Sequence, residues 1–298
     1  MPRQFSLLGL LLPLADPPPA GPPALESVVH ELYIDPIDRP RLHVLAGGDR
    51  IDGLDAHSHF IDAHDREEIA RYGHKPVFAA VLAEGALYLR LPSFHAGTAL
   101  AVHEALAERL RGAPVRYLVL DLRDNRGGSV SAAVEVADEF IDDGVLASTR
   151  GRADIANMLF LAKPGGLLPS AEVVVLVDQM TASAAELLAG ILAHRRGALL
   201  VGRDTYGKSS VQSQVHLEGE RDAMLTIAHY YFDDGSSVGL SGLSPDVQLP
   251  PARLRGQRPP QVPADLPRLL RGDSLILEAL NRLIRRGPAA AVQTRPNA

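Results

Sequence analysis

Ser183 stands where a serine hydroxyl can act as a nucleophile. It follows the apolar run of residues 172–178 and opens a helical pattern over residues 181–196, where its immediate neighbours are alanines. Small neighbours let a polypeptide backbone come close to the hydroxyl. At a helix N-terminus the amide of Ala184 lacks an intrahelical partner and is positively polarised, which suits a developing oxyanion. The structural alternative is that Ser183 only caps the helix.

Gly127 and Gly128 are candidates for the other half of an oxyanion hole. They follow the apolar strand predicted at residues 115–123 and precede a helix predicted from Ser129 to about Phe140. Two glycines between a strand and a helix expose consecutive backbone N–H groups, which can stabilise negative charge. The alternative is an ordinary glycine turn.

Lys208 can serve as the base for Ser183, because no histidine is obviously placed for that role and a neutral lysine can replace one. Lys208 lies just past the strand predicted at residues 197–202, and Gln212 follows four residues later. An even offset on a strand puts both side chains on one face, so the Gln212 amide oxygen can hold the amine. Neutrality near pH 7 requires a lysine pKa about three units below its usual value, about 4 kcal/mol, which desolvation can supply. A solvated lysine in a polar turn is the alternative.

Residues 202–209 match the phosphate-binding pattern G-x-x-x-x-G-K-[ST]. That chemistry requires the loop to open a helix, so that backbone N–H groups and the helix dipole face the phosphates. The residues that follow, SSVQSQVHL, alternate like a strand instead. No apolar strand ending in an aspartate lies downstream to hold magnesium. We therefore expect no nucleotide as a partner.

These candidate residues need an α/β scaffold to bring them together. We expect a hairpin at residues 77–83 and 87–91 and a helix at residues 98–111. The strands and helices already named alternate along the chain, which is typical of a largely parallel sheet. Beyond Lys208 the period changes to two, which predicts an antiparallel hairpin. Two or three short helices are expected between Leu25 and Tyr72, and an amphipathic helix at residues 273–286 follows a proline-rich spacer.

Composition excludes several classes of function. The 298 residues are 46% hydrophobic and 22% charged, which is typical of a globular protein, and they contain no Cys or Trp. Disulfides, zinc-thiolate sites and a cysteine nucleophile are therefore excluded. With 30 Lys+Arg against 36 Asp+Glu the net charge is −6, so nucleic acid is not an expected partner.

Three segments together resemble the carboxyl-terminal processing proteases, also called tail-specific proteases. Residues 121–128 (DLRDNRGG), 177–190 (VDQMTASAAELLAG) and 201–212 (VGRDTYGKSSVQ) are similar to that family's motifs DLRxNPGG, NxxSASASEIxAG and VGxxTFGKGSVQ. The resemblance implies a serine endopeptidase with a Ser-Lys dyad that needs no cofactor or metal. By the same likeness the nucleophile is Ser183, the base Lys208 and the orienting residue Gln212, with the oxyanion hole at Gly127, Gly128 and Ala184, of which Gly128 is the favoured glycine.

The resemblance extends over about residues 26–286 and implies a domain organisation. The family's fold is α/β, with a crotonase-like or ClpP-like spiral of ββα units. We expect a signal peptide and proline-rich linker at residues 1–24, a helical segment at 25–73, the protease core at 74–250, and a proline-rich spacer with the C-terminal helix at 251–298. A frayed apolar N-terminus or a wrongly assigned start is the alternative to the signal. The signal implies export to the periplasm or the cell exterior, where flexible polypeptides would lose C-terminal segments.

The chain also departs from the family. Only Gly-His-Lys-Pro stands between Tyr72 and Val77, where the family carries a PDZ domain, so a separate adaptor can stand in for that domain in substrate selection; an oligomer is compatible with the sequence. Arg126 replaces the family's proline. A rival interpretation is a catalytically silent module that binds a ligand or protein on the same fold. Histidines 57, 59 and 64 with aspartates 55, 62 and 65 are zinc-ligand types, but no fixed scaffold is evident for them and we expect no metal.

Overall fold

The computed structural model describes residues 24–37, 51, 53–72, 75–83, 85–112, 114–219, 221–248 and 281–282. The predicted signal segment before Ala24 and most of the region from residue 249 onward therefore lie outside the described residues. The domain boundaries remain predictions. None of the helices in the described parts has the length and apolar character that a bilayer crossing requires.

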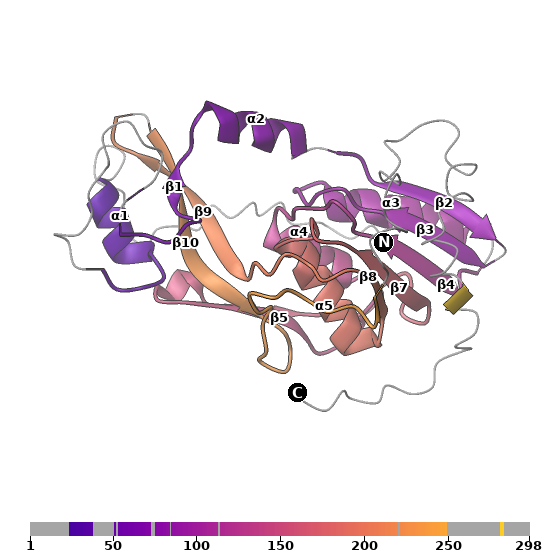
Figure 1. Ribbon diagram of the computed structural model, residues 1–298. Coiled ribbons are helices and arrows are strands. Elements are labelled where there is room, and N and C mark those ends of the chain that lie inside the picture. The colour runs from indigo at the N-terminus through magenta and orange to yellow at the C-terminus, as the bar shows by residue number, and fades with distance from the viewer. Residues whose placement is uncertain are drawn as a thin grey trace.

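A six-stranded sheet holds the turns that contain Ser183 and the pair Gly127 and Gly128, and its order is β11-β8-β7-β4-β3-β2 (Figure 1). The hairpin of β2 (Phe78–Ala83) and β3 (Ala86–Arg90) is antiparallel, as predicted. All the other pairings are parallel, and a helix lies on the connection between the two strands of each pair except β8 and β11. The remaining strands are β4 (Tyr117–Asp121), β7 (Glu172–Val177), β8 (Leu199–Gly202) and β11 (Val247–Gln248).

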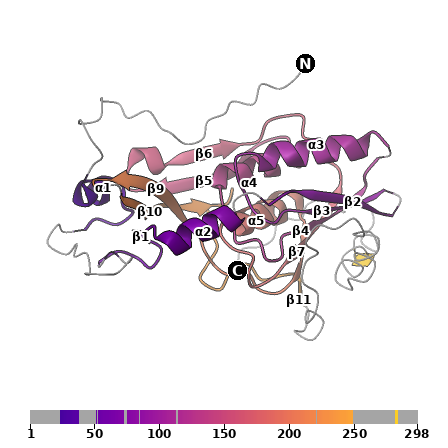
Figure 2. The same ribbon diagram turned by 90° about the horizontal axis from the view of Figure 1, so that it is seen from above.

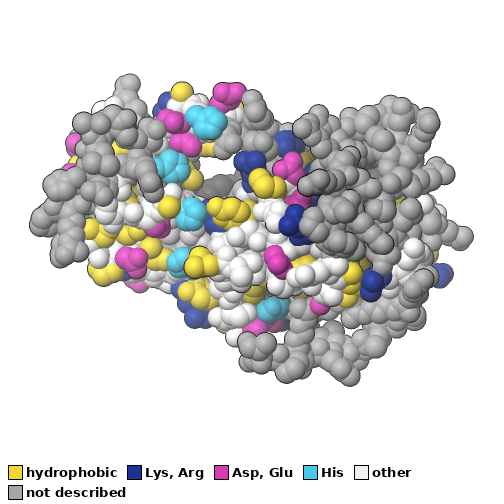
Figure 3. Space-filling view, viewed as in Figure 1, with side chains coloured by type: hydrophobic (Ala, Val, Ile, Leu, Met, Phe, Trp, Pro, Cys, Tyr) yellow, Lys and Arg dark blue, Asp and Glu magenta, His cyan; other side chains and the backbone are white. Residues whose placement is uncertain are grey.

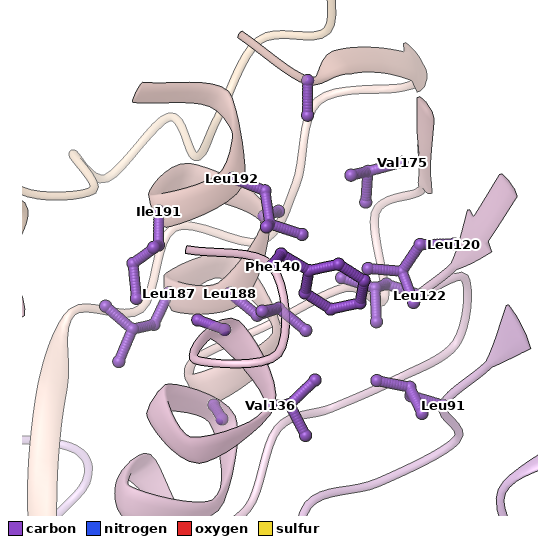
Figure 4. Packing of buried hydrophobic residues seen from close by; sticks show 14 of the residues in the cluster. Leu91, Leu120, Leu122, Val136, Phe140, Val175, Leu187, Leu188, Ile191 and Leu192 are labelled. Atoms are coloured by element: carbon purple, nitrogen blue, oxygen red, sulfur yellow. The ribbon is translucent and has the colours of Figure 1, made fainter. Parts of the chain in front are cut away.

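Three helices cover one face of this sheet (Figure 2). They are α3 (Thr98–Leu110), α4 (Val130–Ala137) and α5 (Ala184–Arg196). Their apolar faces meet alternate leucines and valines of the strands in the main core, and Figure 4 shows the Phe140 ring between leucines of α5 and the pair Leu120 and Leu122, which lie at and just after the end of β4. Helix α5 is buried over nearly its whole length, so it is fixed on the sheet and its first residue has a defined place.

A second sheet is built mainly from the predicted long hairpin. Strands β9 (Ser210–Leu217) and β10 (Arg221–Tyr231) are antiparallel. The other edge of β10 pairs with the short β1 (His59–Phe60) near its start and with β5 (Val145–Gly151) near its end, and β5 pairs with β6 (Met158–Leu161). Strands β5 and β6, with the 3₁₀ turn Asp154–Ala156 between them, were not anticipated from the sequence.

The N-terminal segment packs on this hairpin and not on the main core. Helix α1 (Leu25–Leu32) contributes Val28 and Val29 to a separate apolar cluster with Leu217 and Leu225 (Figure 1). Helix α2 (Ala63–Tyr72) follows β1. The prediction of short helices in residues 25–72 is thus right for two segments, and it missed the strand β1 between them.

Candidate active site

Ser183 lies at a strained turn between β7 and α5. The helix begins at Ala184, one residue after Ser183, so the serine is the N-cap and not a residue of the first turn. Its φ of +56° with ψ of −121° is unusual for a residue with a side chain and costs on the order of 1–3 kcal/mol. The carboxylate of Asp178 holds the turn by accepting from the amides of Met180 and Thr181. A sharp strand-to-helix turn of this kind presents a hydroxyl toward a substrate.

The glycine turn after β4 lies directly against this serine. A Cβ added to Gly127 would be 2.9 Å from the Cβ of Ser183 and 3.0 Å from the nitrogen of Ala184. The Gly127 amide donates to Asn125 Oδ1 at 2.9 Å. Within the described residues, no acceptor faces the amides of Gly128 and Ala184. Of the three amides proposed for an oxyanion hole, those two are therefore available, while Gly127 supplies the close approach.

Lys208 and Gln212 meet as the sequence predicts. The Lys208 ammonium group donates to Gln212 Oε1, and Gln212 Nε2 donates to the hydroxyls of Ser210 at 2.9 Å and Thr226 at 3.2 Å. Burial lowers the pKa of Lys208 to about 8, against the opposing effect of the carboxylates of Asp55 and Glu186. A substantial fraction of Lys208 is therefore neutral just above neutral pH.

Glu186 connects Ser183 to Lys208. It is fully buried, with 0% of its surface exposed. Its Oε2 accepts from the amide of Ser183 at 2.8 Å and from the amide of Lys208 at 2.9 Å. Its Oε1 accepts from Gly207 N at 2.7 Å and from Thr205 Oγ1 at 2.5 Å. One carboxylate oxygen thus binds the backbones of two residues that are 25 positions apart in the chain.

Tyr230 makes the same connection from the second sheet. Its hydroxyl donates to the carbonyl oxygens of Ser183 at 3.3 Å and Lys208 at 3.2 Å. Burial raises the pKa of Tyr230 well above its usual value, with a further contribution from the Glu186 carboxylate, so the phenol keeps its proton. The sequence analysis missed both Glu186 and Tyr230. The pattern Ser-x-x-Glu at 183–186, a capping-box signature, could have indicated the first; no local pattern indicates the second.

The phosphate-binding interpretation fails in the structure for the reason expected. The segment 202–209 leads into strand β9 and not into a helix. The amides of Gly207 and Lys208, which a phosphate would need, donate to the Glu186 carboxylate instead. An anionic phosphate would also be repelled by that carboxylate.

The histidine-rich segment lies beside Lys208 and forms no metal cluster. Burial lowers the pKa of His57, and the nearby charge of Lys208 lowers it further. His59 pairs with Asp65 at 3.3 Å. Among the described residues, the His and Asp ligand atoms close enough to share a metal belong to His194, Asp233 and Asp234. Figure 3 shows this face of the molecule hollowed below α2, with histidine, Lys or Arg, and hydrophobic side chains near the rim.

The chain belongs to peptidase family S41, whose family model matches residues 85–249. The chain is 36% identical over 163 residues to the chloroplastic carboxyl-terminal-processing peptidase 2 of Arabidopsis thaliana, covering 55% of this chain and 32% of that protein. It is 39% identical over 164 residues to the carboxy-terminal-processing protease of Bartonella bacilliformis, covering 54% and 38%. The resemblance to this group of proteases is thereby confirmed, and the matches span about a third of the length of those relatives.

Solved structures agree on the fold. The photosystem II D1 C-terminal processing protease superposes with a TM-score of 0.55 at 32% identity, covering 70% of this chain and 54% of that one. A Bacteroides fragilis structure named as a putative S41 protease superposes with a TM-score of 0.59 at 22% identity, covering 71% of this chain and 58% of that one. The mixed α/β architecture predicted from the sequence is the architecture of these proteases.

Proposed function

We propose that this chain is a serine endopeptidase in which Ser183 is the nucleophile and Lys208 the general base. The proposal rests mainly on the hydrogen bonds that fix these two residues. The Glu186 carboxylate accepts from the backbone amides of both, and Gln212 accepts from the Lys208 amine. The lowered pKa of Lys208 supports the role, because only a neutral amine can take a proton from a serine hydroxyl. The strained turn at Ser183 and the free amides beside it are what acyl transfer requires.

In the proposed reaction, Ser183 Oγ attacks the scissile carbonyl carbon while Lys208 Nζ takes the hydroxyl proton. The amides of Gly128 and Ala184 donate to the oxyanion of the tetrahedral intermediate. Collapse of the intermediate breaks the C–N bond, and the lysine returns the proton to the departing amine. Water then attacks the acyl-enzyme with Lys208 again as base, which releases the acid product and regenerates Ser183.

The substrates in this proposal are flexible polypeptides cut near the C-terminus. The relatives that are more than a third identical are named for C-terminal processing, and the predicted dyad motifs all fall inside the matched region. An extended substrate adding as a strand beside the sheet would bring its carbonyl to Ser183. Exported polypeptides are the expected pool if the N-terminal segment acts as a signal, and the chloroplastic names of some relatives are compatible with such transport.

We also propose that the core is the ββα spiral of this family without an inserted PDZ domain. Helix α2 ends at Tyr72 and β2 begins at Phe78, so residues 73–77 alone join them. Selection of substrates then falls to a separate adaptor. Arg126, exposed in the turn beside Gly127, adds a charge next to the site where the family has proline.

The test is digestion of an unstructured peptide ending in small apolar residues, with products identified by mass. Wild type should cut the peptide, and the Ser183→Ala and Lys208→Ala variants should not. Ser129→Ala is the matched control, because Ser129 also caps a helix after a strand but lies at α4, and it should leave cleavage intact. If wild type cuts no better than the two dyad variants over a broad pH range, the proposal is wrong and a binding module on this fold takes its place.

A further inference from the structure

The Gln212 amide is held on both sides. Its nitrogen has two hydrogens, and each has a hydroxyl acceptor, Ser210 Oγ at 2.9 Å and Thr226 Oγ1 at 3.2 Å. Its oxygen accepts from the Lys208 amine. Ser210 is 7% exposed and Thr226 is fully buried, so water does not compete for these positions.

The backbone is shaped to present Thr226 to Gln212. The two residues are direct cross-strand partners on β10 and β9, and the register shifts immediately afterwards, because Ile227 is an extra residue between the pairs Thr226–Gln212 and Ala228–Val211. A bulge of this kind re-aims the neighbouring side chains and is common beside active sites. A Cβ at Gly151 on β5 would come within 2.1 Å of the Ile227 carbonyl oxygen, so a glycine is required to accommodate the bulge.

The N-terminal segment completes the hydrogen bonds of Thr226. Along this edge of β10, strand β1 pairs with residues 223–224 and β5 with residues 228–231, which leaves Thr226 between them. The gap is filled by Ser58, whose hydroxyl accepts from Thr226 N at 3.0 Å, and by Ile34, whose amide donates to Thr226 O at 3.0 Å. Thr226 is therefore fixed by two segments far away in the sequence.

We propose that Thr226 and Ser210 are positioning residues that fix the orientation of the Gln212 amide and, through it, the hydrogen-bonding geometry of Lys208. Neither residue touches the reacting atoms. The orientation matters because an oxygen facing Lys208 accepts one of its N–H bonds and leaves the lone pair of the neutral amine for Ser183. A flipped amide would offer N–H donors to that lone pair and compete with the serine. The expected effect on catalysis rests on the proposed peptidase function, whereas the orientation of the Gln212 amide does not depend on it.

The test uses the full chain with Thr226→Val, which removes the acceptor and keeps the shape, Thr226→Ser, which restores it, and Ser210→Ala. Losing one hydrogen bond worth about 1 kcal/mol lowers kcat about fivefold. We expect that loss for Thr226→Val and Ser210→Ala, with KM unchanged and with Thr226→Ser within about twofold of wild type. In a Gln212→Ala background Thr226→Val should have no further effect, because its action passes through Gln212. Thr149→Val removes another buried hydroxyl of the same sheet and serves as the control.

A readout without catalysis separates this proposal from the proposed function. Slow exchange of the Gln212 side-chain NH₂ hydrogens by NMR should be lost in Thr226→Val and retained in Thr149→Val. If wild type cleaves no peptide but this protection behaves as expected, the peptidase function fails and the positioning role stands. Unchanged protection and kcat in Thr226→Val, or an equal loss of kcat in the Gln212→Ala background, would overturn the proposal. If Thr226→Val does not fold, Ser210→Ala decides on the same criteria.

Discussion

Replacing Glu186 with glutamine is the sharpest test of how the site is assembled. The carboxylate is fully buried and accepts four hydrogen bonds, two at each oxygen. A glutamine supplies one acceptor oxygen only, and its NH₂ group must face one pair of donors. The least harmful orientation points NH₂ at Thr205 and Gly207, because the threonine hydroxyl can turn to accept. The Gly207 amide then has no acceptor.

The magnitude follows from these contacts. An unsatisfied buried donor costs about 1–3 kcal/mol, and each of the remaining bonds loses roughly 1 kcal/mol when its acceptor becomes neutral. We expect Glu186→Gln to lower the free energy of unfolding by about 4 kcal/mol. Because the amides of Ser183 and Lys208 lose a common anchor, kcat should fall by up to about 100-fold, which is the loss that a misplacement of about 1 Å can cause.

Denaturant unfolding and peptide cleavage measure the two effects. Glu139→Gln is the control, since Glu139 is also a buried glutamate but bonds His103 on α3 and lies in a different part of the chain from the dyad. It should leave kcat within about twofold of wild type. A Glu186→Gln protein that unfolds within 1 kcal/mol of wild type and cleaves at the full rate would refute the idea that this carboxylate holds the site together.

Three further predictions concern the amine and the oxyanion. Because Lys208 must be neutral to act as base and its pKa is lowered to about 8, kcat/KM should rise about tenfold per pH unit below 8 and level off above it; a flat profile from pH 6 to 9 would exclude the lysine as base. The pKa of this lysine is lower in the folded chain than in the unfolded chain, whose lysines titrate near 10.5. The unfolded chain therefore binds more protons between about pH 8 and 10.5, and the free energy of unfolding rises with pH across that window. Below it the folded state carries a buried charge, and Lys208→Met should therefore raise the free energy of unfolding at pH 7, by at most about 3 kcal/mol; a decrease by denaturant titration would contradict this. Gly128→Ala places a Cβ 2.1 Å from the Phe94 carbonyl oxygen, so the turn must move and kcat should fall about 100-fold or more, whereas Gly235→Ala, also at positive φ but in open space, should cleave normally.

The sequence was sufficient for the elements that follow local rules. The continuous apolar runs at 172–178 and 197–202 predicted buried parallel strands, and the structure has β7 and β8 there. The change to a period of two after Lys208 predicted the β9–β10 hairpin, and the even spacing of Lys208 and Gln212 predicted their contact. These features depend on patterns within a few residues.

Other features depend on contacts that no local pattern encodes. The alternation of buried and exposed positions is broken in β5, which is bulged against β6, while the four residues of β6 are all apolar although their burial alternates, and the two strands were missed. Tyr230 was taken only as a strand residue, although its hydroxyl contacts two carbonyl oxygens of the site. The role of Thr226 requires the register of β9 and β10 together with the placement of Ser58, which is 168 residues away. Only the folded chain brings such partners together.

Some residues of the site lower the stability of the folded state and others raise it, and this difference separates residues expected to act in catalysis from residues that hold the site together. Ser183 is held at a positive φ, and Lys208 is held in a buried position that disfavours its charge, so both residues destabilise the folded state. Glu186 offsets this by accepting from four donors that would otherwise be buried without partners. Substitution of Lys208, the proposed base, should therefore stabilise the protein as it abolishes cleavage, while substitution of Glu186 should reduce both stability and cleavage. Residues that only pack would lack this opposition, which arises here because one carboxylate holds the backbones of a strained serine and a buried lysine.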